Sequence, residues 1–320
     1  MTNEPAPPDR AARDALIGAI MGFLEGQDPL ALGEARGALE REIDEAGPGA
    51  LVGLKDRLTD VESSWDYSPP DPLARRLHHI LTDRFLRQDS ELLGIENVTA
   101  VSGRPVVIVP NHLSYADANL VEMLLQRFGG SALADRLTTL AGPKVFSSRT
   151  RRFSSLCFGT IRTPQSAEVS SGEAVMDARE VARAARRSID AARHRLASGD
   201  ALLVFGEGTR SRTGGMQQLL AGVTRYFGDP GTWVLPAGIV GTEALFPIGE
   251  KTIHQVRVVV RVGQPLDAAL LRVGSAANRR VWADAVGLAI AELLPPKYRG
   301  VYREDAGRYA EARRVLSDSR

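Results

Sequence analysis

This chain has a single cysteine and almost no net charge. The only cysteine among 320 residues is Cys157, which excludes an internal disulfide framework and any zinc site built on several thiolates. The 40 Lys and Arg residues are offset by 39 Asp and Glu residues, so the net charge is +1. Such a balance argues against a nucleic-acid-binding protein, and we expect no nucleic-acid partner. The lack of disulfides suits a reducing cytoplasm, where we expect the protein to reside.

Long apolar runs are also missing. A membrane-spanning helix needs roughly 20 consecutive apolar residues, and the longest N-terminal candidate, Ala15–Leu24, is about half as long. It follows Arg10 and Arg13, as a signal peptide would follow its charged start. However, Asp9 and Asp14 lie among these arginines and no small-residue cleavage site follows, so we expect no secretion. Contact with a membrane surface stays open.

The composition that remains is globular, with 43% hydrophobic and 25% charged residues, which is ample for a buried core. Helical patterns broken by glycine and proline fill the first part of the chain, and their last piece, residues 73–86, has apolar residues at helical spacing. We expect a flexible tail at 1–8, a helical segment at 9–90, an α/β domain at 91–300 and a C-terminal helical tail at 301–320.

From about residue 95, apolar runs of strand length alternate with helical patterns. This alternation predicts an α/β fold in which helices flank a central, mostly buried mixed sheet. The run Val256–Val262 alternates apolar and charged residues, which predicts a half-exposed edge strand. The expected strands are 98–101, 106–109, 137–140, 201–205, 233–239 and 256–262, and the expected helices are 115–128, 172–196 and 279–294.

A histidine and an aspartate follow the apolar strand 106–109. His112 falls in the turn after the strand, and Asp117 falls on the first turn of the next helix. Chemistry in open α/β sheets usually lies outside such strand ends. The carboxylate can fold back to one imidazole nitrogen, which leaves the other nitrogen to take a proton from a hydroxyl. The alternative is that Asp117 only stabilises the helix N-terminus and His112 is a surface residue.

A glycine-rich turn follows the apolar strand 201–205 and reads Phe205-Gly-Glu-Gly-Thr-Arg-Ser-Arg212. Its glycines permit a tight turn and close approach of a ligand. Its backbone N–H groups and two arginines suit a phosphate or phosphate ester. Within it, Glu207 can pair with Arg210 or accept a hydrogen bond from a substrate hydroxyl. The alternative is an ordinary turn with a surface ion pair.

A basic stretch lies between residues 144 and 165. Its cations surround the apolar segment Phe153–Phe158, a pattern that suits contact with anionic lipid or with a nucleotide-bearing donor. The alternative is a solvated basic face. The basic residues are Lys144, Arg149, Arg151, Arg152 and Arg162.

The other histidines have no companions at the spacing of metal ligands, and we expect no metal site. A buried or exposed structural role is the simpler interpretation for each of them. These histidines are His78, His79, His194 and His254.

Taken in order, the two polar motifs resemble the glycerolipid acyltransferase superfamily, whose best-known members are 1-acylglycerol-3-phosphate acyltransferases. The motifs are Asn111-His112-x4-Asp117 and, about 90 residues later, Phe205-Gly-Glu-Gly-Thr-Arg-Ser211. Further similar segments are Gly159–Ile161, Gly214–Gly222, Val234–Ile239 and Val262–Leu266, so the resemblance covers roughly residues 95–270.

This resemblance implies that His112 is a general base and that Asp117 orients it. The acceptor hydroxyl then attacks the thioester of acyl-CoA or of an acyl carrier protein directly, so Ser114 is no nucleophile and no cofactor is needed beyond the acyl donor. The block that binds the phosphate end of the lipid acceptor is matched by Glu207, Gly208, Thr209 and Arg210, and Pro236 matches a positioning block.

One departure from the family pattern concerns the acceptor. The second block of the family usually ends in an arginine, but that register falls on Gln165 here, with Arg162 three residues earlier. Arg162 and Lys144 are our further candidates for substrate binding. The departure leaves room for another acceptor, such as a glycolipid or an amine-bearing lipid. A lipid or thioester hydrolase is the enzymatic alternative, although no Gly-x-Ser-x-Gly elbow precedes a helix, and a lipid- or CoA-binding scaffold is the non-enzymatic one.

The implied acceptor lives at a bilayer surface. The resemblance therefore implies peripheral binding at the inner face of the cell membrane. We expect Ala15–Leu24 or the apolar residues around Phe153–Phe158 to dock there.

Overall fold

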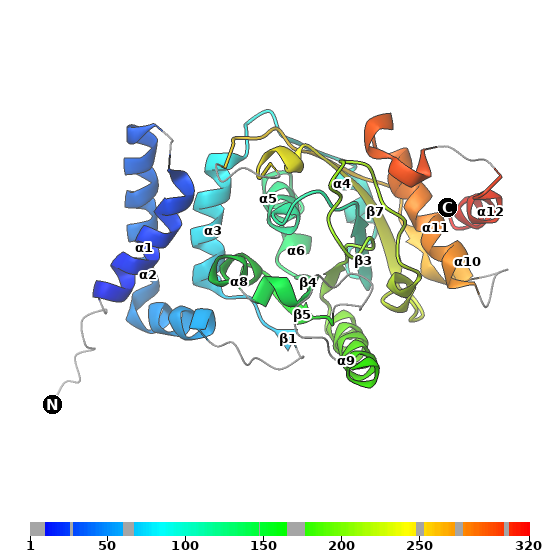
Figure 1. The fold of residues 1–320 in the computed structure, drawn as a ribbon, viewed down its shortest axis with the longest axis horizontal. Coiled ribbons are helices and arrows are strands. Elements are labelled where there is room, and N and C mark those ends of the chain that lie inside the picture. The colour runs from blue at the N-terminus through cyan, green and yellow to red at the C-terminus, as the bar shows by residue number, and fades with distance from the viewer. Residues whose placement is uncertain are drawn as a thin grey trace.

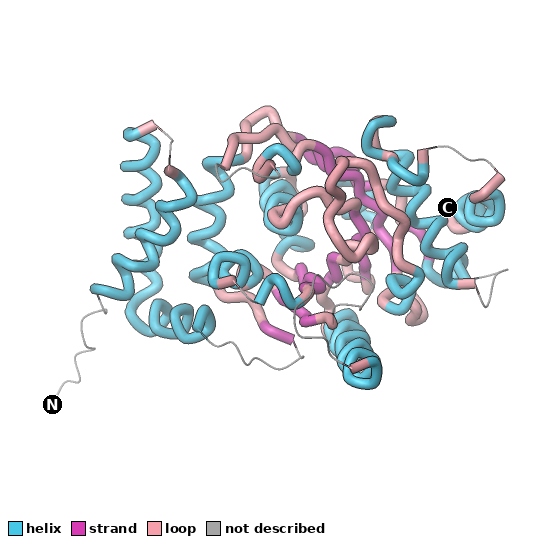
Figure 2. The backbone as a smooth tube through the Cα atoms, in the orientation of Figure 1, coloured by secondary structure: helices cyan, strands magenta, loops and turns pink. Residues whose placement is uncertain are grey.

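The computed structural model of the chain describes residues 10–25, 28–59, 67–146, 148–164, 177–247, 253–272, 278–303 and 307–320. The expected tail at 1–8 lies outside these residues. Helices lie on both sides of a central sheet, as the ribbon in Figure 1 and the tube in Figure 2 show. None of the described helices is long and apolar enough to cross a membrane.

A nine-stranded mixed sheet forms the centre of the fold. Its strands are β1 (Tyr67–Ser68), β2 (Glu91–Leu93), β3 (Val106–Pro110), β4 (Leu137–Ala141), β5 (Gly159–Arg162), β6 (Ala201–Leu203), β7 (Trp233–Val240), β8 (Val259–Val262) and β9 (Leu266–Asp267). The order is β1-β5-β4-β6-β3-β7-β8-β2, with β9 paired to β7. The strands from β5 to β7 are parallel, whereas β1 and β8 join them antiparallel. The predicted α/β fold with a mixed sheet is confirmed.

Helices cover the sheet and extend beyond it on one side. The described α-helices are α1 (Arg10–Met21), α2 (Pro29–Thr59), α3 (Pro72–Phe85), α4 (Ile95–Ala100), α5 (Asp117–Arg127), α6 (Ser131–Ala134), α7 (Pro143–Phe146), α8 (Arg149–Ser155), α9 (Ala178–Ala197), α10 (Ala268–Arg272), α11 (Arg279–Glu292) and α12 (Ala310–Asp318). Helix α11 packs on β3 and β7, and α9 packs on β5 and β6. Helix α3 contacts α2, α5 and α8. In Figure 1 the groups α1–α3 and α10–α12 lie on opposite sides of the sheet.

The N-terminal helices bury their apolar residues against the rest of the chain. In α1 and the short turn after it, Ile17, Ile20 and Leu24 are buried. Helix α2 is kinked at Gly47, whose φ of 79° is accessible to glycine at little cost. The apolar residues of Ala15–Leu24 that are buried in this way are not presented to a membrane, contrary to the expectation that the segment docks there.

Two expected strands differ in the structure. Residues 98–101 lie in α4 and the turn after it, where Val98 and Val101 are buried three residues apart, a helical spacing. Residues 259–262 do form β8, but this strand lies inside the sheet between β7 and β2 rather than at its edge. The edge is taken by β2, which is too short to leave a strand pattern in the sequence.

The other expected elements are found with ends shifted by a few residues. The strands expected at 106–109, 137–140, 201–205 and 233–239 are β3, β4, β6 and β7. The helices expected at 73–86, 115–128 and 279–294 are α3, α5 and α11. Of the helix expected at 172–196, the first residues lie outside the described residues and the remainder is α9.

The strands β4, β6 and β3 are parallel neighbours, so the connections that follow them leave the same edge of the sheet. Each run of buried apolar residues ends there, because polar side chains and glycines follow it in the sequence. The connection after β3 is 111–116, that after β4 includes α7 and α8, and that after β6 is the glycine-rich turn. This edge is where a ligand is expected in such a sheet.

Candidate active site

A cavity of about 1280 Å³ opens where these three connections meet. His112 lines it from the connection after β3, Lys144 and Arg151 from that after β4, and Arg210 from that after β6. The structure therefore brings His112 and Arg210 into one cavity, although they are almost a hundred residues apart in the sequence.

His112 and Asp117 form a hydrogen-bonded pair at the start of α5. The imidazole Nδ1 lies 2.9 Å from the carboxylate Oδ2 of Asp117, and the same oxygen accepts hydrogen bonds from the backbone N–H groups of Leu113 (2.7 Å) and Ser114 (3.0 Å). Asp117 is fully buried, and the His112 ring stacks on Phe205 with 4.2 Å between ring centroids. Because the carboxylate occupies Nδ1, the Nε2 atom is left to exchange a proton with a ligand in the cavity.

Glu207 lies behind the cavity wall and ties two connections together. Its carboxylate accepts hydrogen bonds from the backbone N–H of His112 and of Gln217, both at 2.7 Å. The side chain is not among the residues that line the cavity, and no ion pair joins it to Arg210 among the described contacts. Burial raises the pKa of Glu207 to about 7, although the two N–H donors lower it. Its geometry is thus that of a residue that positions His112 rather than one that contacts a ligand.

The glycine-rich turn brings backbone to the cavity wall. Gly208 has a φ of 73°, and a Cβ atom there would lie 2.6 Å from the side chain of Leu220. Gly208, Thr209 and Arg210 all line the cavity, and their contact with a ligand stays a prediction. Only glycine fits position 208 in this conformation.

Among the described residues of the cavity wall, all formal charges are positive. The cations are Lys144, Arg151, Arg210, Arg212 and Arg225, and no aspartate or glutamate is among the described residues that line the cavity. An excess of positive charge in a confined space attracts anions, and arginine binds phosphate oxygens in a bidentate manner. The wall is therefore suited to a ligand that carries a phosphate or several of them.

Residues 89–240 match the family model described as Acyltransferase. This segment is an acyltransferase domain. It contains His112, Asp117 and the glycine-rich turn, and the resemblance to the glycerolipid acyltransferase superfamily is confirmed.

Among solved structures, the chain is similar to the 1-acyl-sn-glycerophosphate (LPA) acyltransferase PlsC from Thermotoga maritima. The sequence identity is 19%, the TM-score is 0.44, and the match covers 89% of this chain and 96% of that chain. A likeness of this size carries no conclusion about activity. No curated protein matches the sequence.

One predicted substrate-binding residue of the acyltransferase domain lies elsewhere. The guanidinium carbon of Arg162 lies 4.4 Å from the ring centroid of Phe146, and Arg162 is not among the residues that line the cavity. Burial, together with the neighbouring Arg152, lowers the pKa of Arg162. Arg162 is the last residue of β5. Lys144, the other candidate, does line the cavity.

The part of the cavity wall that α3, α5 and α8 contribute is mostly apolar and is called the apolar arm here. On α3 the stripe His78, Leu81, Thr82 and Phe85 faces it. Its other large apolar residues include Phe23, Leu120 and Phe153. Phe153 and Phe158, expected to touch a membrane, are 5% exposed, so the Phe153–Phe158 segment is part of the protein interior. The arm offers space for a hydrocarbon chain.

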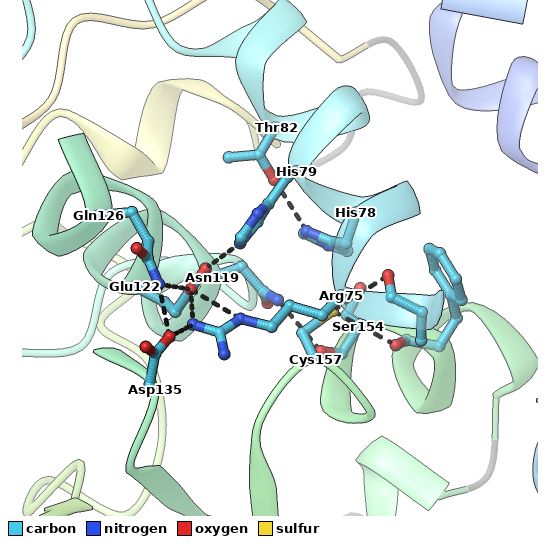
Figure 3. A network of polar contacts seen from close by, with 12 residues as sticks. Arg75, His78, His79, Thr82, Asn119, Glu122, Gln126, Asp135, Ser154 and Cys157 are labelled. Carbon is cyan, nitrogen blue, oxygen red and sulfur yellow. Dashed lines mark hydrogen bonds and ion pairs between the residues drawn. The ribbon is translucent and has the colours of Figure 1, made fainter. Parts of the chain in front are cut away.

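A polar network joins α3 to α5, and the sequence did not predict it (Figure 3). The buried carboxylate of Glu122 on α5 accepts hydrogen bonds from Arg75 (2.7 Å) and binds His79 (2.8 Å), both from α3. Although burial raises it, the contacts with His79 and Arg75 hold the pKa of Glu122 below its ordinary value. Next to the network, burial lowers the pKa of His78 to about 4, so this imidazole is neutral at pH 7. The partners are more than 40 residues apart, and no pattern in the sequence joins them.

In the part of the chain that the structure describes, no group of three or more His, Cys, Asp or Glu residues could hold a metal ion. His79 binds Glu122, His78 binds Thr82 at 2.8 Å, and His194 is exposed.

Proposed function

We propose that this acyltransferase moves a fatty acyl group from acyl-CoA or an acyl carrier protein to a hydroxyl of a lysophospholipid or another glycerol-phosphate-type acceptor. The observation that carries the proposal is that the His112–Asp117 pair shares one cavity with five cations and no described carboxylate in the wall. The acid-free wall suits the phosphate of the acceptor or of the donor, and the apolar arm suits the acyl chain.

In the proposed step, Nε2 of His112 takes the proton of the acceptor hydroxyl. The oxygen attacks the carbonyl carbon of the thioester, the carbon–sulfur bond breaks, and the thiolate leaves with the proton returned by His112. Asp117 holds the imidazole in the required tautomer and stabilises its charged form. Glu207 keeps the backbone of His112 in place.

Direct transfer, without an acyl-enzyme, agrees with the surroundings of Ser114 and Cys157. Ser114 is 1% exposed, and its Oγ accepts a hydrogen bond from the N–H of Ala116. Burial raises the pKa of the Cys157 thiol well above its ordinary value, and Cys157 is 1% exposed. Neither side chain lines the cavity.

The decisive test is a mass-spectrometric screen of the purified protein with acyl-CoA against lysophosphatidic acid, other lysophospholipids, a glycolipid and an amine-bearing lipid. We expect an acylated product from a phosphate-bearing lysolipid. Release of free CoA and fatty acid without an acylated product contradicts transfer and identifies a thioesterase instead. A parallel reaction with an acyl carrier protein as donor distinguishes the two donors.

We further propose peripheral binding at the inner face of the cell membrane, because the acceptor is a bilayer lipid. Flotation with anionic vesicles at low ionic strength tests this, and protein that stays wholly in the lipid-free fraction contradicts it. Exposed apolar side chains such as Leu30 and Val52 on α2, rather than the buried residues of 15–24, are candidates for the contact.

A further inference from the structure

The ring of Tyr115 is contacted by two arginines. The guanidinium carbon of Arg151 lies 4.5 Å from its centroid and that of Arg210 lies 4.4 Å from it. The two guanidinium carbons are therefore no farther apart than the sum of these distances. All three side chains line the cavity, and Tyr115 follows His112 by three residues.

Both arginines stack on Tyr115, and no carboxylate among the described residues forms an ion pair with either. The Arg151 Nη1 donates a hydrogen bond to the backbone carbonyl of Lys144 at 3.2 Å, which ties α8 to α7. Among the described residues, neither Arg151 nor Arg210 makes an ion pair with a carboxylate. Two like charges held close together repel each other, and an anion placed between them reverses the sign of the interaction.

We propose that Arg151 and Arg210 bind one phosphate monoester of the acceptor together and that Tyr115 positions both guanidinium groups. The inference rests on the proposed function and adds two residues to it. Arginine stacks on aromatic faces and can still present its N–H groups to phosphate oxygens at the edge of the guanidinium plane. The second arginine of the acceptor site thus comes from α8, whereas Arg162 on β5 is occupied elsewhere.

The position of Tyr115 ties this phosphate site to the reaction. Because Tyr115 and His112 belong to the same short connection after β3, a phosphate held at the ring fixes the distance between the acceptor's charged end and the base. Such positioning raises the effective concentration of the hydroxyl at Nε2. A lysolipid without a phosphate monoester loses this anchor.

The test is direct binding, measured by calorimetry below the micellar concentration, of lysophosphatidic acid, monoacylglycerol and free CoA. We expect Arg151→Gln to weaken binding of lysophosphatidic acid by about tenfold or more, the loss of one charged hydrogen bond. Monoacylglycerol and CoA should bind as they do to the wild type. The matched control is Arg149→Gln, because Arg149 lies on the same helix but is exposed and does not line the cavity.

Tyr115 is tested with two variants. Tyr115→Phe keeps the aromatic face and should bind lysophosphatidic acid like the wild type. Tyr115→Leu removes the face and should weaken binding severalfold, with a smaller effect than Arg151→Gln. Thermal unfolding of each variant shows that it is folded.

Three results overturn the inference: unchanged binding of lysophosphatidic acid by Arg151→Gln, equal weakening of monoacylglycerol, or weakening of CoA alone, which would assign Arg151 to the donor. Failure of the proposed function is recognised separately. Wild-type protein that binds lysophosphatidic acid but transfers no acyl group contradicts the acyltransferase reaction and leaves the phosphate site intact.

Discussion

Two charged regions lie along α5 and are built on opposite principles. Midway along the helix, the buried Glu122 meets Arg75 and His79, and Arg75 also meets Asp135, so each charge has a partner. Near the start of the helix, the cavity wall carries five cations and no described carboxylate. Ion pairs between opposite charges hold α3 against α5, whereas the excess of positive charge in the described cavity wall suits an anionic ligand. The substitutions below test the difference between the two regions.

The largest effect is expected for His112→Ala. Loss of a general base lowers the rate of acyl transfer by about 100-fold or more. Initial rates at saturating acyl-CoA measure it, and His194→Ala, which changes an exposed histidine outside the cavity, is the control. Near-full turnover by His112→Ala would assign the proton transfer to another group.

The compensated region should respond in stability rather than in rate. Glu122→Gln leaves Arg75 and His79 facing a neutral side chain, and we expect a loss of about 3 kcal/mol in the free energy of unfolding. The control is Asp135→Asn, since Asp135 is exposed and its pairing is worth less than about 1 kcal/mol. Urea denaturation measures both variants. Equal losses in the free energy of unfolding for the two variants would mean that the burial of Glu122 does not strengthen its ion pairs.

Glu207 differs from both regions. It is a buried carboxyl group, and its described hydrogen-bond partners are two backbone N–H groups. Its pKa is raised from 4.5 to about 7, so the folded state holds a proton that the unfolded state has already lost. The free energy of unfolding should therefore fall as the pH rises from 4.5 to 7, by about 2–3 kcal/mol, and then level off.

The difference between the wild type and Glu207→Gln, measured by denaturation across this range, isolates the effect. The amide does not titrate, so the variant should lack this part of the pH dependence. A constant difference between the two proteins from pH 4.5 to 7 would show that Glu207 is ionised throughout.

In the cavity wall, Arg210→Ala should weaken binding of the acceptor without unfolding the protein. We expect a rise in the KM of a phosphate-bearing acceptor by about tenfold, since one charged hydrogen bond is lost. The KM of acyl-CoA and the melting temperature serve as internal controls. An unchanged acceptor KM removes Arg210 from the acceptor site.

The smallest effect is expected for Arg162→Gln. Arg162 stacks on Phe146 outside the cavity wall, so the KM of the acceptor should change by no more than about twofold. Steady-state kinetics beside Arg210→Ala compare the two arginines directly. A tenfold rise for Arg162→Gln would show that it reaches the ligand during turnover.

The sequence predicted the elements whose pattern is local. Buried apolar runs such as Val106–Pro110 mark the parallel strands, and the short spacing of His112 and Asp117 allows only a local contact. Strand order is not local: β8 has an amphipathic sequence but lies inside the sheet, because the three residues of β2 pair with its outer side. Sequence patterning cannot reveal a partner that short.

The site was predicted in part for the same reason. His112, Lys144 and Arg210 follow strand ends, and strand ends meet in a parallel sheet. Whether an arginine at such an end turns into the cavity depends on what packs beside it. Arg162 stacks on Phe146, whereas Arg151 stacks on Tyr115. Only the tertiary structure shows which aromatic ring each arginine contacts.

The three connections at the carboxyl edge carry different functional groups of the site. The proton-accepting pair is carried on the connection after β3, whereas Lys144 and Arg151 are carried on the connection after β4. Because the base and these two cations belong to different connections, an exchange of the connection after β4 for that of a relative leaves His112 and Asp117 unchanged. New ligand preferences in this scaffold are thus within reach of a single loop graft, and chimeras at that loop are a direct way to redesign which lipid it accepts.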